Sequence, residues 1–447
     1  MVKVITYGTY DLLHYGHIRL LERAKKLGDY LIVGITADDF DKKRGKINVQ
    51  QSLEERIAAV QATGIADKII IEEYEGQKID DIRKYGVDIF TVGSDWTGYF
   101  DYLREYCKVV YLPRTEGVSS SEIRSERSSL KIGMVGYSPF LRKFYNESTF
   151  VNGISVIGLC VPTRGDLAEL EKNLIVYTDS YDELLKAVDA VYIHSCPSLH
   201  FEQCRMALEA GKHVLCESPL AMDATECQLL IHLAKEKGLI LMEALRTAYI
   251  MAYTRMLLLL KGGKIGKLIS VDATCTSLSS TEKNGNNRRW GSLEAWGPTA
   301  LLPVFQILGT NYISKHFFTI LNSEEDYDCF TKIDFTYQNS VASIKVGNGV
   351  KSEGELIISG TEGYVYVPSP WWKMDYFEIR YENPADNKRY FYQVDGEGIR
   401  YELVALANSI RNGFPDYHIR RNVTTEISKL MQEYEEQFSR KEYNNGH

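Results

Sequence analysis

The sequence lacks the features that would place it in a membrane, outside the cell or on nucleic acid. Its apolar runs, such as Met256–Leu260, are far too short to cross a bilayer. Its eight cysteines show no Cys-x-x-Cys spacing, which argues against a zinc site and a disulfide framework. The formal net charge of −8 argues against a general nucleic-acid binder, and the chain opens on a strand pattern, not on a basic-then-apolar leader. We therefore expect a cytoplasmic protein with reduced thiols, no membrane insertion and no nucleic-acid partner.

The sequence has no internal repeat and no low-complexity tract, and its composition is that of a globular protein, with 44% hydrophobic and 25% charged residues. At 447 residues it exceeds one ordinary hydrophobic core, so two or three domains are expected. The polar segment Ser119–Ser129 separates one pattern of strands and helices from another that begins at Lys131, and longer alternating runs begin near Leu268. We predict domains at residues 1–127, 128–245 and 246–447.

Short apolar runs alternate with helical patterns in the first of these domains, which is typical of a parallel sheet wrapped by helices. The predicted strands are Val2–Thr6, Tyr30–Thr36, Lys68–Glu72, Ile89–Val92 and Val109–Leu112. The predicted helices are Ile18–Leu27, Ser52–Thr63 and Lys78–Tyr85.

A second α/β pattern follows, with helices between its strands. Its predicted strands are Lys131–Gly136, Ser155–Cys160, Ala190–Ser195 and His213–Cys216. The later alternating runs predict a mostly antiparallel sheet, with strands at Lys332–Tyr337, Val341–Val346 and Glu355–Ser359. Arg400–Asn412 and the charged C-terminal tail have helical spacing.

The most informative stretch follows the first predicted strand, where a small-residue turn presents two histidines at the mouth of a helix expected to begin near Ile18. It reads Gly8-Thr9-Tyr10-Asp11-Leu12-Leu13-His14-Tyr15-Gly16-His17. A helix N-terminus offers unpaired N–H groups and a partial positive charge, which suit a phosphate. Two imidazoles add donors that can follow charge developing on a phosphoryl oxygen. The pattern indicates phosphoryl or nucleotidyl chemistry more than a capped surface helix.

Two further motifs stand in order behind this turn, Gly93-Ser94-Asp95-Trp96 and Arg114-Thr115-Glu116-Gly117-Val118-Ser119-Ser120-Ser121. With them the first domain resembles the glycerol-3-phosphate cytidylyltransferase family. The resemblance implies a doubly wound fold, a dimer, and a reaction of CTP with a polyol phosphate that gives a CDP-polyol and pyrophosphate. It implies a role in assembling cell-surface polymers.

The resemblance, together with the chemistry of the side chains, gives a set of candidate site residues. The candidates for catalysis are His14, His17, Lys46 and Arg114. The candidates for nucleotide and substrate binding are Gly8, Thr9, Tyr10, Asp11, Gly16, Asp95, Trp96, Thr115, Gly117, Ser119, Ser120 and Ser121. Asp11 could orient acceptor hydroxyls or a Mg²⁺ ion that accompanies CTP, and the sequence does not choose between them. No residue is assigned as a ligand of a resident metal.

Two departures from the family pattern bear on the acceptor. The serine-rich motif ends Ser120-Ser121 where the family has two threonines, which keeps the hydroxyls. The family's Arg-Tyr-Val-Asp run is replaced by Gly64-Ile65-Ala66-Asp67, which removes an arginine that could bind phosphate. We therefore expect a small polyol phosphate, most simply a glycerol phosphate, and leave glycerol 3-phosphate and glycerol 2-phosphate both open.

Residues 131–415 resemble the Gfo/Idh/MocA oxidoreductases, which have a Rossmann domain followed by an α+β domain. The resemblance rests on Lys131–Gly136, on Pro197-Ser198-Leu199-His200 and on the run Ala210–Pro219, which includes Glu217-Ser218-Pro219. The family's reactive lysine is replaced by Ser218. In the looser later motif, the family's acid and its proton-transferring residue become Ala295 and Thr299. Neither can act as a general acid or base near neutral pH.

The dinucleotide loop of this second domain is also altered. Gly136 keeps the first glycine of G-x-G-x-x-G, but Ser138 and Leu141 replace the other two. No acid follows the next predicted strand, so NAD(P) binding is doubtful. Three interpretations stay open for this half: a scaffold for dimerisation, a ligand-binding module that uses the old cleft, and a working reductase that makes the polyol phosphate. For the whole chain, a non-catalytic nucleotide-binding regulator is the alternative to an enzyme.

Overall fold

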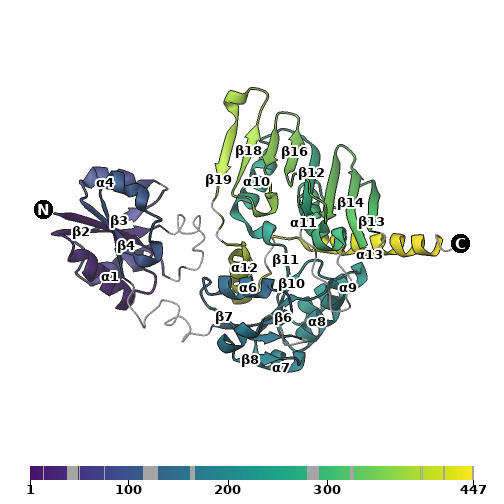
Figure 1. Cartoon of the computed structure of the whole chain (residues 1–447), viewed down its shortest axis with the longest axis horizontal. Helices are drawn as coiled ribbons and strands as arrows, with labels where there is room; N and C mark the ends of the chain where they lie inside the picture. Colours follow the sequence, from purple (N-terminus) through teal and green to yellow (C-terminus); the bar gives the residue numbers. More distant parts are fainter. Residues whose placement is uncertain are drawn as a thin grey trace. The chain divides into compact units, whose positions relative to one another are not determined.

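The structure is a computed structural model that describes residues 1–13, 15–37, 49, 51–74, 76–113, 129–161, 167–278, 291–322, 327–392, 394, 396–415 and 418–444. The chain forms two compact units, Met1–Ser129 and Leu130–His447 (Figure 1). Both the second and the third predicted domains lie in the second unit.

The first unit is built on a parallel sheet with the strand order β3-β2-β1-β4-β5. Its strands are β1 (Lys3–Gly8), β2 (Tyr30–Thr36), β3 (Lys68–Glu72), β4 (Ile89–Gly93) and β5 (Lys108–Leu112). Its helices are α1 (Tyr15–Lys25), α3 (Leu53–Ala62) and α4 (Gln77–Tyr85), with short 3₁₀ turns η1 (Ser94–Trp96) and η2 (Asp101–Glu105). The doubly wound parallel sheet expected from the sequence is confirmed. The strand order changes direction between β1 and β4, and ligands of such sheets bind at the carboxyl ends of the strands at this point.

Local sequence explains most of these boundaries. Ser52 begins α3 with a capping box, in which its hydroxyl accepts from the Glu55 amide at 3.3 Å and its own amide donates to the Glu55 carboxylate at 2.7 Å. The predicted start of the first helix is wrong, because α1 begins at Tyr15 and not near Ile18. A glycine such as Gly16 is tolerated in a first turn, whose N–H groups have no partner inside the helix.

The second unit begins with a parallel sheet in the order β11-β10-β9-β6-β7-β8. Its strands are β6 (Leu130–Gly136), β7 (Ile154–Cys160), β8 (Val176–Thr178), β9 (Ala190–His194), β10 (His213–Glu217) and β11 (Leu241–Ala244). Its helices are α6 (Phe140–Ser148), α7 (Tyr181–Ala187), α8 (Pro197–Glu209) and α9 (Ala224–Glu236), followed by the 3₁₀ turn η4 (Arg246–Tyr249) and α10 (Met251–Lys261). This is the Rossmann-type sheet that the sequence predicts.

An eight-stranded sheet in the order β13-β14-β15-β12-β16-β17-β18-β19 completes the unit. Its strands are β12 (Leu268–Ser277), β13 (Ser314–Asn322), β14 (Tyr327–Thr336), β15 (Val341–Asn348), β16 (Leu356–Gly360), β17 (Tyr364–Val367), β18 (Tyr376–Arg380) and β19 (Lys388–Phe391). All neighbouring strands are antiparallel except β12 and β15, so the mostly antiparallel sheet is confirmed. Helix α11 (Ser292–Leu308) packs on β12, β14 and β15, and α12 (Ile399–Asn412) packs on α6 and η4.

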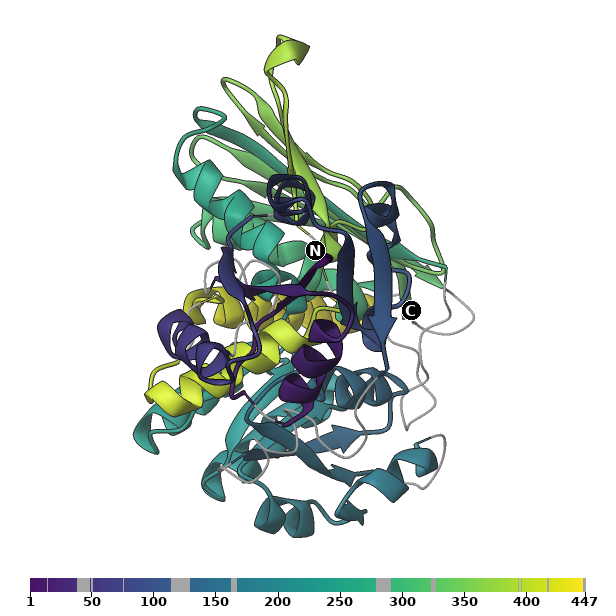
Figure 2. The same cartoon turned by 90° about the vertical axis from the view of Figure 1, so that its left-hand side faces the viewer.

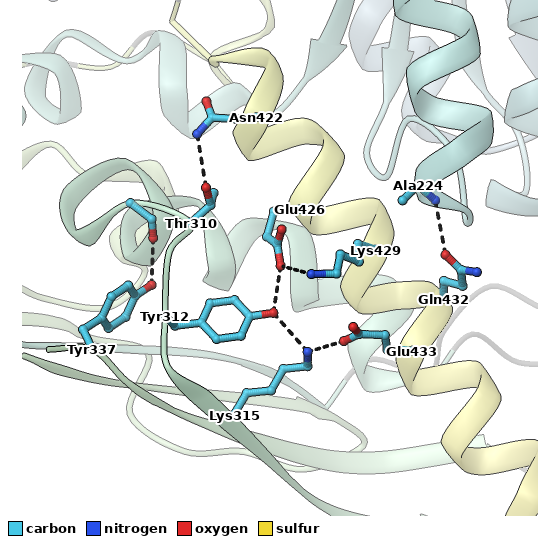
Figure 3. A network of polar contacts seen from close by, with 11 residues as sticks. Ala224, Thr310, Tyr312, Lys315, Tyr337, Asn422, Glu426, Lys429, Gln432 and Glu433 are labelled. Atoms are coloured by element: carbon cyan, nitrogen blue, oxygen red, sulfur yellow. Dashed lines mark hydrogen bonds and ion pairs between the residues drawn. The ribbon is translucent and has the colours of Figure 1, made fainter.

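The last helix, α13 (Arg421–Asn444), joins the two sheets of this unit. It packs against α9 of the Rossmann-type part and against α11 of the C-terminal part (Figure 2). The Tyr312 hydroxyl donates to Glu426 of α13 at 2.7 Å, and Lys315 forms an ion pair with Glu433 (Figure 3). On the other side, Gln432 accepts a 3.5 Å contact from the Ala224 amide. These contacts hold the two sheets together as one compact unit.

Candidate functional site

The turn that follows β1 has an unusual backbone. Tyr10 and Leu12, which flank Asp11, both have left-handed φ angles, 53° and 47°. Non-glycine residues adopt this conformation at a cost of about 1 kcal/mol or more, so the surrounding contacts must impose it. A side chain at Gly8 would place its Cβ 3.0 Å from the Tyr10 ring, so the turn is also tightly packed against the strand end.

Contacts from the start of α3 hold this turn. Asp11 is almost fully buried, and its carboxylate accepts a hydrogen bond from the Gln51 amide at 3.0 Å. The Gln51 side chain accepts in return from the Leu12 amide at 2.7 Å. This reciprocal pair explains how the left-handed residues on either side of Asp11 persist. The Asp11 carboxylate therefore already has a structural partner.

Arg56 of α3 holds the same turn from beneath. Its side chain is fully buried, and its guanidinium donates to the main-chain carbonyls of Thr9 at 2.7 Å, Thr36 at 2.9 Å and Gln51 at 3.2 Å. It thus joins the ends of β1 and β2 to the segment before α3. The sequence analysis missed Arg56, because Glu54-Glu55-Arg56 has the pattern of a solvated helix face.

His17 lies in the first turn of α1, half-buried, with its ring edge-on to the Tyr10 ring at a centroid distance of 5.6 Å. Burial raises the pKa of the Tyr10 hydroxyl. The packing fixes the position of the His17 ring relative to the strand end. The second predicted histidine, His14, lies outside the described residues.

The neighbouring strand β4 brings a second part of the predicted site to the same edge. In the parallel pairing of β1 with β4, Thr6 stands beside Thr91, so Gly8 and Gly93 lie near each other at the carboxyl edge. Asp95 and Trp96 follow in η1. The Trp96 indole is 37% exposed and packs on the ring of Phe100 at 5.8 Å, so it presents a partly open aromatic face.

A buried ion pair that the sequence analysis missed lies at the ends of β1 and β3. Lys78 of α4 pairs with Glu72, and both side chains are at most 8% exposed. The Lys78 ammonium also lies 4.6 Å from the centre of the Tyr7 ring, and the Tyr7 hydroxyl donates to Asp81 at 2.8 Å. Burial, with the Asp81 charge, raises the pKa of Tyr7. Local sequence gives no sign that this lysine is buried.

The remaining predicted residues of the first unit lie outside the described residues. They are Lys46, Arg114, Thr115, Gly117, Ser119, Ser120 and Ser121. Gly64 is described: it adopts a left-handed φ of 66°, and a Cβ added there would contact nothing within 4 Å. The position where the family pattern has an arginine thus takes a glycine conformation in this chain.

In the second unit, Gly136 ends β6 and is needed for packing. Its φ is +132°, and a Cβ there would lie 2.1 Å from the His194 carbonyl oxygen of the adjacent strand. Ser138 is buried, and its hydroxyl accepts from the Phe140 amide at 3.2 Å, in the first turn of α6. A dinucleotide pyrophosphate would need such amides free. The centre of the Phe140 ring lies 5.1 Å from the centre of the His194 ring and 4.4 Å from the Cζ atom of Arg246.

The residues after β10 are occupied by internal contacts. Tyr192 donates to Glu217, and the Ser218 hydroxyl donates to the buried Glu243. The Pro219 carbonyl lies 2.8 Å from the His200 ring, whose pKa burial lowers. Ser218 thus serves as a hydrogen-bond donor to Glu243 and carries no charge toward a substrate.

Ala295 and Thr299 both lie on α11, both partly buried. Next to them, the Trp296 ring packs on the Trp372 ring at 4.9 Å. The old cleft could also take cations and rings from Arg246, Tyr249, Arg288, Arg289 and Trp290. Tyr249 is buried and donates to the Glu243 carbonyl at 3.1 Å, whereas the Arg246 guanidinium lies over the Phe140 ring. Arg288, Arg289 and Trp290 lie outside the described residues.

Three general features complete the description. Across the part of the chain that the structure describes, no group of three His, Cys, Asp or Glu side chains could hold a metal ion. Within the same residues, no helix is both long enough and apolar enough to pass through a bilayer. All eight cysteines are free thiols.

Comparisons with known proteins divide the chain in the same way. The cytidylyltransferase-like family matches residues 5–126, and the NAD-binding Rossmann fold of the Gfo/Idh/MocA oxidoreductase family matches residues 130–245. A glycerol-3-phosphate cytidylyltransferase of Bacillus spizizenii is 50% identical over 130 residues, which are 29% of this chain and the whole of that protein.

The second unit has more distant relatives. A dTDP-3,4-didehydro-2,6-dideoxy-alpha-D-glucose 3-reductase of Streptomyces violaceoruber is 41% identical over 100 residues, 22% of this chain and 29% of that protein. The crystal structure of an aldose-aldose oxidoreductase from Caulobacter crescentus aligns with 70% of this chain and 98% of its own, at a TM-score of 0.61 and 17% identity. At that identity the likeness shows the fold alone.

Proposed function

We propose that this protein transfers CMP from CTP to a glycerol phosphate. The proposal rests on its first unit, through which the chain belongs to the glycerol-3-phosphate cytidylyltransferase family and is a CTP-dependent cytidylyltransferase. An oxygen of the acceptor phosphate attacks the α-phosphorus of CTP. The bond from that phosphorus to the bridging oxygen breaks, and pyrophosphate leaves with the electron pair. The product is CDP-glycerol.

Positioning and charge neutralisation carry most of the rate in such a transfer. We assign His14 and His17 to the triphosphate, where their ring N–H groups would stabilise charge on the phosphoryl oxygens. Lys46 would neutralise the nucleotide from its basic loop. Arg114, with the hydroxyls and amides of Ser119, Ser120 and Ser121, would form a second anion site.

The observation that carries this assignment is the preorganised turn after β1. Arg56 and Gln51 hold Thr9, Asp11 and Leu12 in place at the point where the strand order reverses. A turn fixed before substrate arrives does not have to be ordered during the reaction. The half-buried His17 ring is fixed beside it by Tyr10.

Mg²⁺ belongs to this scheme as part of the substrate, bound to the triphosphate. The described residues offer no resident site made of three protein ligands, and the Asp11 carboxylate already accepts the Gln51 amide. The Mg²⁺ ion would offset the negative charge of the triphosphate as pyrophosphate leaves.

A direct assay tests the proposal. The protein is incubated with CTP, Mg²⁺ and, separately, glycerol 3-phosphate, glycerol 2-phosphate or ribitol 5-phosphate, and pyrophosphate is measured. We expect release with one glycerol phosphate. Release with ribitol 5-phosphate alone would overturn the proposed acceptor. CTP binding without release for any acceptor would favour the non-catalytic nucleotide-binding regulator.

We further propose that the second unit no longer transfers hydride and does not use NAD(P). Ser138 occupies an amide of the first turn of α6, and Phe140 with Arg246 covers the end of β9. Ser218, Ala295 and Thr299 supply no acid, base or charge for the reaction. A saturable titration with NADH or NADPH would support the bifunctional transferase–reductase instead.

We also propose that the protein works as a cytoplasmic homodimer. Free thiols suit a reducing compartment. The edge strand β13 exposes Phe318 and Ile320, at 55% and 61%. Light scattering coupled to size exclusion tests the mass: a monomer at micromolar concentration would contradict the dimer.

A further inference from the structure

Several asparagines of this chain are directly followed by glycine, at Asn152, Asn284, Asn348, Asn412 and Asn445. Such a step is chemically labile, because glycine has no Cβ to hinder an attack by its own main-chain nitrogen on the asparagine side chain. The structure describes Asn152, Asn348 and Asn412, each together with the glycine that follows it. All three belong to the second unit, and the transferase reaction uses none of them.

The reaction at such a step converts asparagine without an enzyme. The glycine nitrogen loses its proton to a base and forms a bond to the asparagine Cγ atom. The bond from Cγ to the side-chain nitrogen breaks, and ammonia leaves with that electron pair and a proton from solvent. Water then opens the cyclic succinimide at either of its carbonyls. Opening at Cγ gives aspartate, and opening at the main-chain carbonyl gives isoaspartate.

Asn412, the last residue of α12, is exposed, and so is the Gly413 that follows it. Gly413 has a left-handed φ of 70°, and a Cβ there would meet nothing within 4 Å, so no neighbouring group crowds the step. The Gly413 amide donates to the Ile410 carbonyl at 3.4 Å, which is longer than a typical N–H···O bond. Phe414, the next residue, is 71% exposed. Ring closure at Asn412 therefore has to break only weak local contacts.

Asn348 has the same following residue in the opposite surroundings. It ends β15, pairs with Ser277 of β12 and is only 2% exposed. The Gly349 amide donates to the Ser277 carbonyl at 2.8 Å. Attack by this nitrogen requires the two strands to separate at their ends. The rate is therefore reduced to the small fraction of time in which they are open.

Asn152 stands between these two cases. It is half-buried, and its main-chain carbonyl accepts a 3.4 Å hydrogen bond from the Arg411 guanidinium. A Cβ at Gly153 would lie 2.0 Å from the same guanidinium, so this step is crowded. The Gly153 carbonyl accepts from the Leu130 amide at 3.0 Å, at the start of β6. Ring closure at Asn152 has to disturb both contacts.

We propose that Asn412 is a site of spontaneous deamidation, at which the chain forms aspartate and isoaspartate through a succinimide with Gly413. The new carboxylate stands at the C-terminal end of α12, where the main-chain carbonyls already carry partial negative charge, so it disfavours the helix end. Isoaspartate also adds one carbon to the main chain. Because α12 packs on α6 and η4, the converted protein should melt at a lower temperature. The proposal does not depend on the activity of the first unit.

Storage of the full-length protein at physiological temperature in heavy-oxygen water tests the proposal. The water that opens the succinimide leaves its oxygen in the product, and peptide mapping by mass spectrometry measures the conversion separately at each asparagine. In the folded protein, Asn412 should convert about tenfold or more faster than Asn348, with Asn152 between them. In urea the three rates should converge, because the folded structure no longer protects any of them.

Asn412→Gln should abolish the conversion at this position and keep the melting temperature constant during storage, because glutamine would have to close a larger ring. Asn408→Gln is the matched control: it lies on the same helix and precedes Ser409, and it should leave the rate at Asn412 unchanged. Equal rates at Asn412 and Asn348 in the folded protein would overturn the proposal. So would an Asn412 that stays intact in the folded protein for as long as it takes to convert in urea.

Discussion

The guanidinium of Arg56 donates a 2.7 Å hydrogen bond to the main-chain carbonyl of Thr9, the residue after β1. The contact joins a helix to a turn 47 residues earlier in the chain, and the guanidinium is completely buried. Three main-chain carbonyls accept hydrogen bonds from the Arg56 guanidinium. These bonds explain why the guanidinium is buried, and no charged group of a substrate is needed. Arg56 is thus a positioning residue for the candidate nucleotide site.

Replacing Arg56 should damage both stability and transfer. Arg56→Met leaves buried carbonyls unpaired, and we expect a loss of about 3 kcal/mol in the free energy of unfolding. Arg56→Lys keeps the charge and should recover part of this loss. Chemical denaturation would measure the first effect, and pyrophosphate release at about 20 °C below the melting temperature would measure the second. Arg104→Ala, at an exposed ion pair with Asp101, is the control and should leave both unchanged. A fall in KM alone for Arg56→Lys would contradict a role in holding the turn.

His17→Ala should lower kcat by about a hundredfold or more, because it removes a donor assigned to the triphosphate. The fold should survive, since His17 is only half-buried on α1. His232→Ala provides the control, because that histidine is 80% exposed on α9 of the other unit. Transfer by His17→Ala at the wild-type rate would remove the histidine from the mechanism.

Gly136→Ala should destabilise the second unit even though no cofactor is expected to bind there. The new Cβ would meet the His194 carbonyl oxygen at 2.1 Å, at a φ that side chains rarely adopt. We expect a loss of about 2 kcal/mol or more. Gly262→Ala is the comparison, because its nearest contact would be an ordinary 3.4 Å. Equal melting temperatures for the two variants would show that the glycine is not needed for packing.

The pH dependence of stability should carry a contribution from Asp328. Burial raises the pKa of this carboxyl group from its ordinary value of 3.8 to about 6, although Ser292, Thr331 and the Leu293 amide donate to it. The folded state therefore binds a proton that the unfolded state releases, so this contribution to stability grows as the pH falls from about 6 to about 4.

The expected size of this contribution is on the order of 3 kcal/mol, for a shift of about two pKa units in a buried group. Urea denaturation between these pH values, for the wild type and Asp328→Asn, isolates it. The difference in unfolding free energy between the two proteins should change with pH in this window. A constant difference would show that the Asp328 pKa is not raised.

The order of the elements could be predicted from the sequence, but the partners of the charged residues could not. The runs Tyr30–Thr36 and Lys68–Glu72 coincide with β2 and β3, because short continuous apolar runs are typical of strands in a parallel sheet covered by helices. Helix α11 has no such signal, since Pro298 and Pro303 lie inside it. Strand β13 shows no clear alternation, because its exposed face also carries the apolar residues Phe318 and Ile320.

The candidate sites show the same division. The turn from Gly8 to Asp11 could be predicted, because its residue types are specific to one chemistry. Arg56 and Lys78 could not, since each stands near other charged residues on its helix and only the tertiary packing buries it. Likewise, the sequence shows that Ser138 and Ser218 replace family residues. It does not show that Ser138 accepts a hydrogen bond from the Phe140 amide or that Ser218 donates one to Glu243.

The path of the chain through the two units sets an order for their synthesis. All five strands of the first sheet come from residues before Pro113, so a ribosome exposes that sheet long before the chain is finished. The second unit needs α13, its last helix, to join its two sheets, through Glu426 and Glu433 on one side and Gln432 on the other. The transferase unit can therefore fold before the last segment of the second unit is synthesised. A chain truncated before Arg421 should keep the first unit folded, whereas the two sheets of the second unit would lose the helix that joins them.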